Sequence, residues 1–104
     1  MALRVRVCKL TEIVDAKLRA FKVKGVTWPV LVTRVDGEIL ATAGVCPHED
    51  VELVDGDLDG SVVTCPGHSY ELDMRTGACL HDKGLNLRRY PITVVGDELW
   101  VDLL

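Results

Sequence analysis

The chain has 104 residues, enough for one domain with its own core and too few for two domains of ordinary size. A hydrophobic fraction of 48% and a charged fraction of 27% are typical of globular proteins and exclude a disordered or fibrous chain. The formal net charge of -4 also argues against a general nucleic-acid binder, which needs a concentrated basic surface.

The first segment, from Leu3 to Val7, alternates apolar and charged residues. This pattern predicts a half-buried strand, with Leu3, Val5 and Val7 on one face, and not an export signal. No apolar run reaches the ~18 residues that span a bilayer. We therefore expect a cytoplasmic chain with no membrane partner. Its four cysteines could form two disulfides, but in a reducing compartment paired thiols more often bind metal.

Short strands separated by turns follow along the chain. A polar connector at 11–15, which could form one helical turn, leads to a second alternating run at 18–23. Two further runs, 30–35 and 38–42, flank Asp36-Gly37, a dipeptide that readily adopts the positive φ angles of a tight hairpin. The first part of the chain is therefore predicted to be antiparallel β-structure.

The composition changes between residues 44 and 87, where Gly, Pro, Asp and His become frequent and the strand-like segments become shorter. Regular alternation resumes at 87–90 and 92–95, turns at Gly96-Asp97 and returns at 98–102. The sequence thus predicts one all-β domain over residues 1–104. A loop-rich subdomain at about 44–87 is inserted into a β base made of 1–43 and 88–104.

Two short motifs in this inserted region combine one sulfur and one nitrogen donor each. Cys46-Pro47-His48 is a C-x-H pair, and Cys65-Pro66-Gly67-His68 is a C-x-x-H pair that begins after sixteen intervening residues. The four donors suit a metal centre. Each proline fixes φ directly after the cysteine and stiffens the loop. Gly56 and Gly60, between the motifs, permit sharp bends and close backbone approach.

These paired motifs resemble those of the Rieske iron-sulfur family at all four ligand positions. The resemblance implies one 2Fe-2S cluster, with Cys46 and Cys65 on one iron and His48 and His68 on the other. It also implies an antiparallel β-sandwich or barrel base carrying the cluster-binding subdomain. Two neutral imidazoles in place of thiolates make the cluster easier to reduce. A zinc-stabilised interaction module remains an alternative, because two cysteines and two histidines also suit tetrahedral zinc.

The chain resembles the soluble ferredoxins of this family and not the high-potential membrane proteins. Gly67 and Val51 occupy the positions where those proteins carry an extra disulfide, and Leu72 cannot supply the hydrogen bond that they direct at the cluster. We therefore expect a potential toward the lower end of the Rieske range. Backbone N–H groups near the following residues are expected to donate hydrogen bonds to the cluster sulfurs: Glu49, Asp50, Gly67 and Ser69.

The segment 46–51 and the Tyr90-Pro91 pair resemble the ferredoxins of diiron aromatic or alkene monooxygenases most closely, with those of ring-hydroxylating dioxygenases a near second. The resemblance implies a monomeric one-electron carrier, used in aromatic hydrocarbon catabolism, between an NAD(P)H-dependent flavin reductase and an oxygenase. It implies no catalytic residues. Rieske oxygenase subunits also contain this domain, but after His68 only His81 remains, too few ligands for their second iron site.

Other residues are given simpler interpretations. Cys8 and Cys79 are predicted to pack in the core, His81 to be solvated in a loop that lacks the proline common in this family, and Trp28, Trp100 and Phe21 to be core residues. Six acids between the two motifs form a rim that could steer the chain toward basic partner faces. They are Glu49, Asp50, Glu52, Asp55, Asp57 and Asp59.

Overall fold

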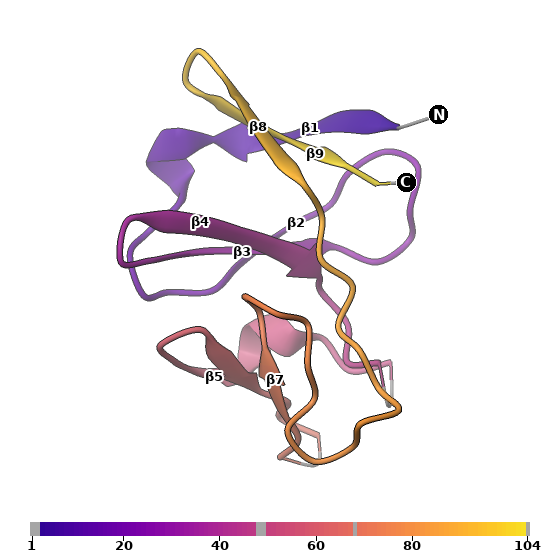
Figure 1. Ribbon diagram of the computed structural model, residues 1–104. Coiled ribbons are helices and arrows are strands. Elements are labelled where there is room, and N and C mark those ends of the chain that lie inside the picture. The colour runs from indigo at the N-terminus through magenta and orange to yellow at the C-terminus, as the bar shows by residue number, and fades with distance from the viewer. Residues whose placement is uncertain (1–2, 48–49, 68, 104) are drawn as a thin grey trace.

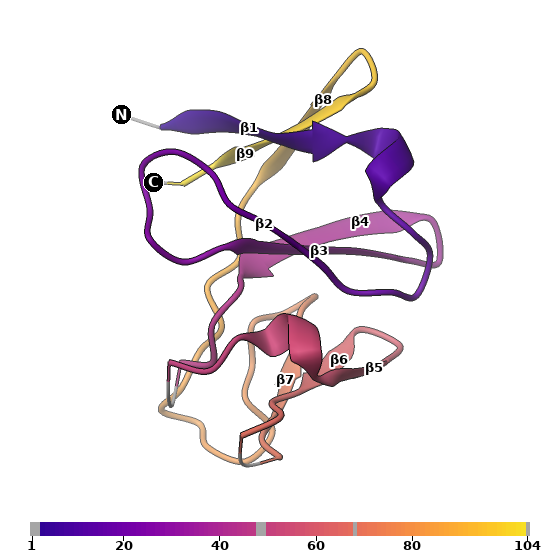
Figure 2. The same cartoon turned by 180° about the vertical axis from the view of Figure 1, so that it is seen from behind.

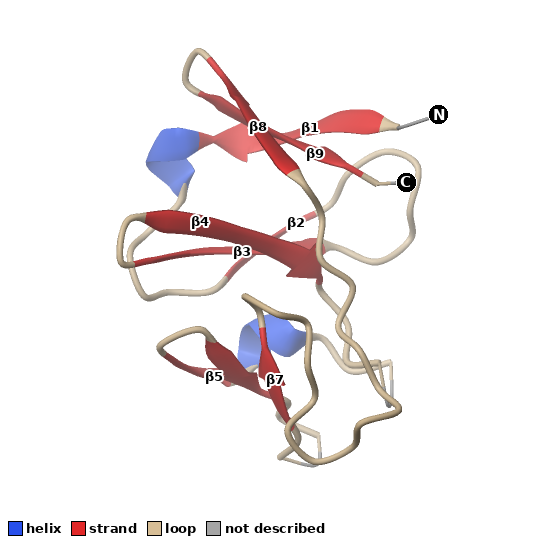
Figure 3. Cartoon of the chain, in the orientation of Figure 1, coloured by secondary structure: helices blue, strands red, loops and turns tan. Residues whose placement is uncertain are grey.

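The computed structural model describes residues 3–47, 50–67 and 69–103. Within these ranges the regular secondary structure is almost entirely antiparallel strand, as predicted, in three three-stranded sheets (Figures 1 and 3). The sheet formed by the two chain ends has the order β1-β9-β8. Its strands are β1 (Arg4–Lys9), β8 (Ile92–Val95) and β9 (Glu98–Asp102).

The other two sheets follow each other along the chain. The middle sheet consists of β2 (Arg19–Phe21), β3 (Val30–Val35) and β4 (Glu38–Ala43). The third consists of β5 (Asp57–Asp59), β6 (Val62–Thr64) and β7 (Glu71–Asp73) and lies in the loop-rich region. Two single 3₁₀ turns complete the described elements: η1 (Leu10–Glu12) and η2 (Leu53–Asp55).

The hairpin between β3 and β4 forms at the predicted turn. Asp36 and Gly37 have φ angles of 52° and 80°, so both central residues are left-handed, as a two-residue hairpin of this hand requires. The pairing runs from Val35 opposite Glu38 to Val30 opposite Ala43. An Asp-Gly pair thus sets the register of the sheet on which the loop-rich region rests.

The first strand departs from strict alternation. Its pairing with β9 shifts between Arg6 and Cys8, and this β-bulge turns both Val7 and Cys8 inward. Leu3, predicted to share the buried face with Val5 and Val7, lies before the strand and is 43% exposed. Cys8 was predicted to be buried, although strict alternation with Leu3, Val5 and Val7 would place it on the opposite face. The bulge explains its burial.

Strands β3 and β4 of the middle sheet are largely buried, because the sheet separates two hydrophobic clusters. Figures 1 and 2 show the middle sheet between the β1-β9-β8 sheet and the loop-rich region. Val30 and Val32 pack into the first cluster, with β1 and β9 residues such as Val7 and Leu99. Leu31, between them in sequence, packs into the second cluster. This second cluster joins β3 and β4 to the loop-rich region and contains Leu53, Val63, Leu72 and Met74. A strand that is covered on both faces has apolar residues at consecutive positions and not only at alternate ones.

The chain enters and leaves the loop-rich region along neighbouring paths. The Ala43 N–H donates to the Arg88 carbonyl (2.8 Å), and the Tyr90 N–H donates to the Ala41 carbonyl (2.9 Å). Gly44 begins the region, and a Cβ there would lie 2.7 Å from the Pro29 carbonyl oxygen. Residues 87–90, predicted as regular β-structure, contribute only the bridge between Arg89 and Thr42.

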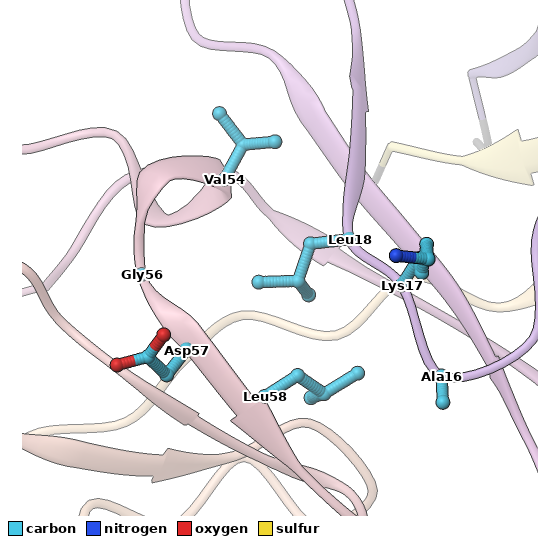
Figure 4. A pocket seen from close by; sticks show the side chains of 7 residues that line it. All are labelled: Ala16, Lys17, Leu18, Val54, Gly56, Asp57 and Leu58. Atoms are coloured by element: carbon cyan, nitrogen blue, oxygen red, sulfur yellow. The ribbon is translucent and has the colours of Figure 1, made fainter.

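A groove of about 350 Å³ marks the junction between the base and the loop-rich region. Figure 4 shows Leu18 on one side of this space and Val54 and Leu58 on the other. All three side chains also pack against the second hydrophobic cluster. The groove therefore continues the apolar contact that fixes the loop-rich region on the middle sheet.

Candidate metal centre

Two loops of the same construction begin at the predicted cysteine ligands. The Cys46 N–H donates to the carbonyl of Val51 (2.9 Å), and the Cys65 N–H donates to the carbonyl of Tyr70 (2.8 Å). Each hydrogen bond closes a six-residue loop that starts at a cysteine. The first ligand loop is 46–51 and the second ligand loop is 65–70, and each contains the histidine of its motif.

The first ligand loop is anchored on both sides by backbone pairing. Val45 and Glu52, which flank it, form an antiparallel bridge, and the Leu53 N–H donates to the Gly44 carbonyl (2.9 Å). These contacts continue into η2, whose Leu53 is fully buried. The ends of this loop are therefore fixed to each other by backbone hydrogen bonds.

The second ligand loop lies between β6 and β7, where Thr64 pairs with Glu71. Ser69 has a φ of 62°, and its N–H donates to the Cys65 carbonyl (2.9 Å). The sequence predicted that the Ser69 N–H faces the cluster sulfurs. In the structure this donor closes the loop on itself, which gives the reversal of chain direction that a C-x-x-H arm needs.

Both predicted cysteine ligands are buried in one place. Cys46 is 2% exposed and Cys65 is 0% exposed, and both belong to the second hydrophobic cluster. Neither forms a disulfide. His48, His68 and the acidic-rim residue Glu49 lie outside the described residues. Among the residues that are described, no three metal-binding side chains come together, and of the four predicted ligands the structure describes the two cysteines.

The other two cysteines are packed in the core, as predicted. Cys8 lies in the first cluster and Cys79 in the second, and both are free thiols. Burial raises the pKa of Cys8 to about 11, with a smaller contribution from Glu12. Cys8 also lies in the first cluster, apart from the second cluster that contains Cys46 and Cys65, so we assign it to core packing.

The third loop, residues 80–85, is held against the second ligand loop. His81 was predicted to be solvated, and its side chain is 44% exposed. Nevertheless its Nε2 lies 3.2 Å from Oε1 of Glu71, and its ring stacks on Tyr70 with a centroid distance of 5.6 Å and an interplanar angle of 23°. The sequence interpretation missed these contacts. The available signal in the sequence was the turn at Thr76-Gly77, because strands paired across this turn place residue 81 opposite residue 70.

The acidic rim is exposed where the structure describes it. Asp50, Glu52, Asp55, Asp57 and Asp59 are all exposed. None of these five forms an ion pair with the described basic residues. Region 44–87 holds nine of the sixteen acidic residues and two of the twelve lysines and arginines. The two ligand loops thus belong to the negatively charged part of the chain.

The residues present fit an iron-sulfur group. Two buried, unbridged cysteines begin matching loops, and the motif places one histidine in each loop. This is the donor set of a mixed thiolate and imidazole centre. The fold and the loops together define the class of protein: a small β-domain with two loops whose cysteines and motif histidines suit a metal group.

The comparisons with known proteins identify the family. Residues 4–91 match the model of the Rieske [2Fe-2S] domain, so the chain belongs to this family. Its relatives include the ferredoxin component of the p-cumate 2,3-dioxygenase system of Pseudomonas putida, 42% identical over 66% of this chain and 60% of that protein. They also include the ferredoxin component of the alkene monooxygenase system of Xanthobacter autotrophicus (strain ATCC BAA-1158 / Py2), 28% identical over 93% and 79%.

A solved structure agrees with the sequence comparisons. A chain in the complex of reduced oxygenase and oxidized ferredoxin in carbazole 1,9a-dioxygenase superposes with a TM-score of 0.84, at 27% identity, over 95% of this chain and 92% of that chain. The predicted Rieske ferredoxin, its all-β fold and its role as an electron-transfer component are confirmed. The chain carries one 2Fe-2S cluster, and not the zinc ion considered as an alternative. No helix within the described residues is long and apolar enough to cross a membrane.

Proposed function

We propose that this chain is the ferredoxin of a bacterial oxygenase system, holding its cluster through Cys46, His48, Cys65 and His68. The observation that carries the proposal is the pair of matching loops, each begun by a buried cysteine and each containing one motif histidine. The bound cluster supplies the capacity to take up and release one electron. The partners are a flavin-dependent reductase as donor and an oxygenase as acceptor.

The chain's own residues provide the environment for this exchange. The second hydrophobic cluster keeps Cys46 and Cys65 away from water, which protects thiolate ligands. The backbone hydrogen bonds that close the loops hold the arms in place, so little rearrangement accompanies a change of charge at the centre. The two histidines are proposed as the exit point for the electron, because each lies within an arm bounded by exposed residues such as Pro47 and Gly67.

Two types of oxygenase are candidates for the acceptor. A diiron monooxygenase is favoured by the residues 46–51, and the alkene monooxygenase ferredoxin aligns with most of the chain. The second candidate is a ring-hydroxylating dioxygenase, supported by the higher identity to the p-cumate ferredoxin. We also propose a cytoplasmic location, in keeping with four cysteines that are all unbridged.

Reconstitution tests the function. The purified holoprotein would be combined with NADH, a flavin reductase and either a diiron hydroxylase or a Rieske dioxygenase, and product formation measured with and without the ferredoxin. Turnover that requires the ferredoxin with one oxygenase supports the proposal and identifies the type. Reduction by the reductase without onward transfer to either oxygenase would contradict it.

A further inference from the structure

The contact between His81 and Tyr70 is part of a regular cross-strand arrangement. Leu72 and Cys79 form an antiparallel bridge, the Leu80 N–H donates to the Glu71 carbonyl (2.8 Å), and the Asp73 N–H donates to the Ala78 carbonyl (2.9 Å). One residue further along the same register, His81 lies opposite Tyr70. Tyr70 is the last residue of the second ligand loop, so their ring stack is the cross-strand pair at the end of that loop. Residues that lie opposite each other on one face of an antiparallel pair of strands stabilise the pairing.

Tyr70 is also the residue that closes this ligand loop, because its carbonyl accepts the hydrogen bond from the Cys65 N–H. Its ring therefore lies at the point where the arm joins β7. A side chain that holds this ring fixes the orientation of the closing peptide. The neighbouring contact from His81 to Glu71 acts on the same junction, since Glu71 is the first residue of β7.

Contacts other than those of His81 also stabilise the third loop. Asp82 stabilises a turn in which its carboxylate accepts from the Gly84 N–H (2.8 Å) and its carbonyl from the Leu85 N–H (3.1 Å). Leu85 packs on the second hydrophobic cluster. The side chain of His81 connects this preformed loop to Tyr70 and Glu71.

We propose that His81 is a positioning residue for the cluster, because its ring stack on Tyr70 and its contact with Glu71 fasten the third loop to the second ligand loop. The third loop here lacks a proline, and the His81 contact supplies the rigidity. The inference rests on the ligand set proposed above, in which the second ligand loop supplies Cys65 and His68.

The test compares purified holoprotein variants by two measurements that do not use turnover: the rate of cluster loss to an iron chelator, and the electron paramagnetic resonance spectrum of the reduced cluster. His81→Ala removes the stack, and His81→Phe restores a ring without the Glu71 contact. Lys83→Ala is the matched control, because Lys83 is exposed in the same loop and has no ion pair with described residues.

We expect His81→Ala to lose its cluster about 2- to 12-fold faster than the parent, the range that corresponds to the ~0.5–1.5 kcal/mol of an aromatic pair. Its spectrum shifts, while His81→Phe recovers most of both properties and Lys83→Ala resembles the parent. The proposal is overturned if His81→Ala matches Lys83→Ala in both measurements, or if His81→Phe recovers neither. A parent protein without a cluster would instead refute the proposed ligand set.

Discussion

The indole Nε1 of Trp28 donates a hydrogen bond of 2.7 Å to the hydroxyl of Tyr90, across 62 positions of sequence. Tyr90 is buried in the first hydrophobic cluster, and Trp28 packs against it. Trp28 directly precedes Pro29, whose carbonyl accepts from the Gly44 N–H at the entry to the loop-rich region, and Tyr90 lies in the segment by which the chain leaves that region. The bond therefore ties together both connections to the metal-binding part of the chain.

Replacing Tyr90 with Phe should destabilise the protein by about 1–2 kcal/mol. The substitution keeps the ring but leaves the Trp28 donor without its partner, and a partly buried donor that loses its hydrogen bond costs this much. Urea unfolding of the holoprotein, followed by tryptophan fluorescence, measures the change. An unchanged midpoint would mean that water satisfies the indole N–H equally well.

The four cysteines should divide into two pairs when each is replaced by Ala. Cys46→Ala and Cys65→Ala should abolish assembly of the cluster, because each removes a proposed sulfur ligand from a loop whose backbone remains closed. Cys8→Ala and Cys79→Ala, which only reduce core packing, should retain it. Iron and acid-labile sulfide analysis gives the result. Loss of the cluster in Cys79→Ala with retention in Cys46→Ala would reverse the assignment.

Gly56→Ala should damage the metal-binding region more than Gly60→Ala does. A Cβ at Gly56 would lie 2.0 Å from the carbonyl oxygen of Thr64, immediately before Cys65, whereas a Cβ at Gly60 meets nothing within 4 Å. We expect a loss of ~3 kcal/mol for Gly56→Ala, from the backbone displacement. For Gly60→Ala we expect about 1 kcal/mol, from its φ of 60°. Thermal unfolding and cluster content report both effects, and equal losses would contradict this interpretation.

The buried thiol of Cys8 should make stability fall at alkaline pH. Its folded pKa of about 11 lies above the reference value of 9.0, so the unfolded chain loses this proton first as pH rises. The contribution of Cys8 is complete below about pH 9 and is lost as pH approaches about 11. The difference in unfolding free energy between the parent and Cys8→Ala should therefore shrink from pH 8 to pH 10.5. A constant difference would show that burial leaves the thiol unperturbed.

Electron transfer to the partners should depend on salt through the acidic rim. Exposed charges steer association, and added salt screens them beyond ~8 Å at physiological ionic strength. The second-order rate constant for electron transfer should fall by about 10-fold between low salt and ~0.5 M. A double variant, Asp55→Asn with Asp59→Asn, should flatten this dependence in stopped-flow measurements.

The matched control for the rim places the same charge change in two turns of the base. Asp36→Asn with Asp97→Asn neutralises two exposed acids in the β3–β4 and β8–β9 turns. Asn also tolerates the left-handed conformation found at Asp36. This variant should keep the salt dependence of the parent. If both double variants flatten it equally, net charge and not the rim governs the encounter.

Features that depend on neighbouring residues could be predicted from the sequence. The two cysteine-histidine motifs name their donors directly, and Asp36-Gly37 sets its own hairpin because local φ preferences decide it. The change from alternating apolar and polar residues to a Gly- and Pro-rich composition likewise predicted where the loop-rich region begins.

Contacts between distant segments were decided by the tertiary structure. Only the fold shows that Cys46 and Cys65 share one hydrophobic cluster with Leu31, that a bulge buries Cys8, and that His81 stacks on Tyr70. Side-chain periodicity reports which face of a strand is apolar, but not which segment covers it. The sequence by itself therefore determined the chemistry of the centre, while the packing of the loop-rich region on the middle sheet decided the surroundings in which that chemistry takes place.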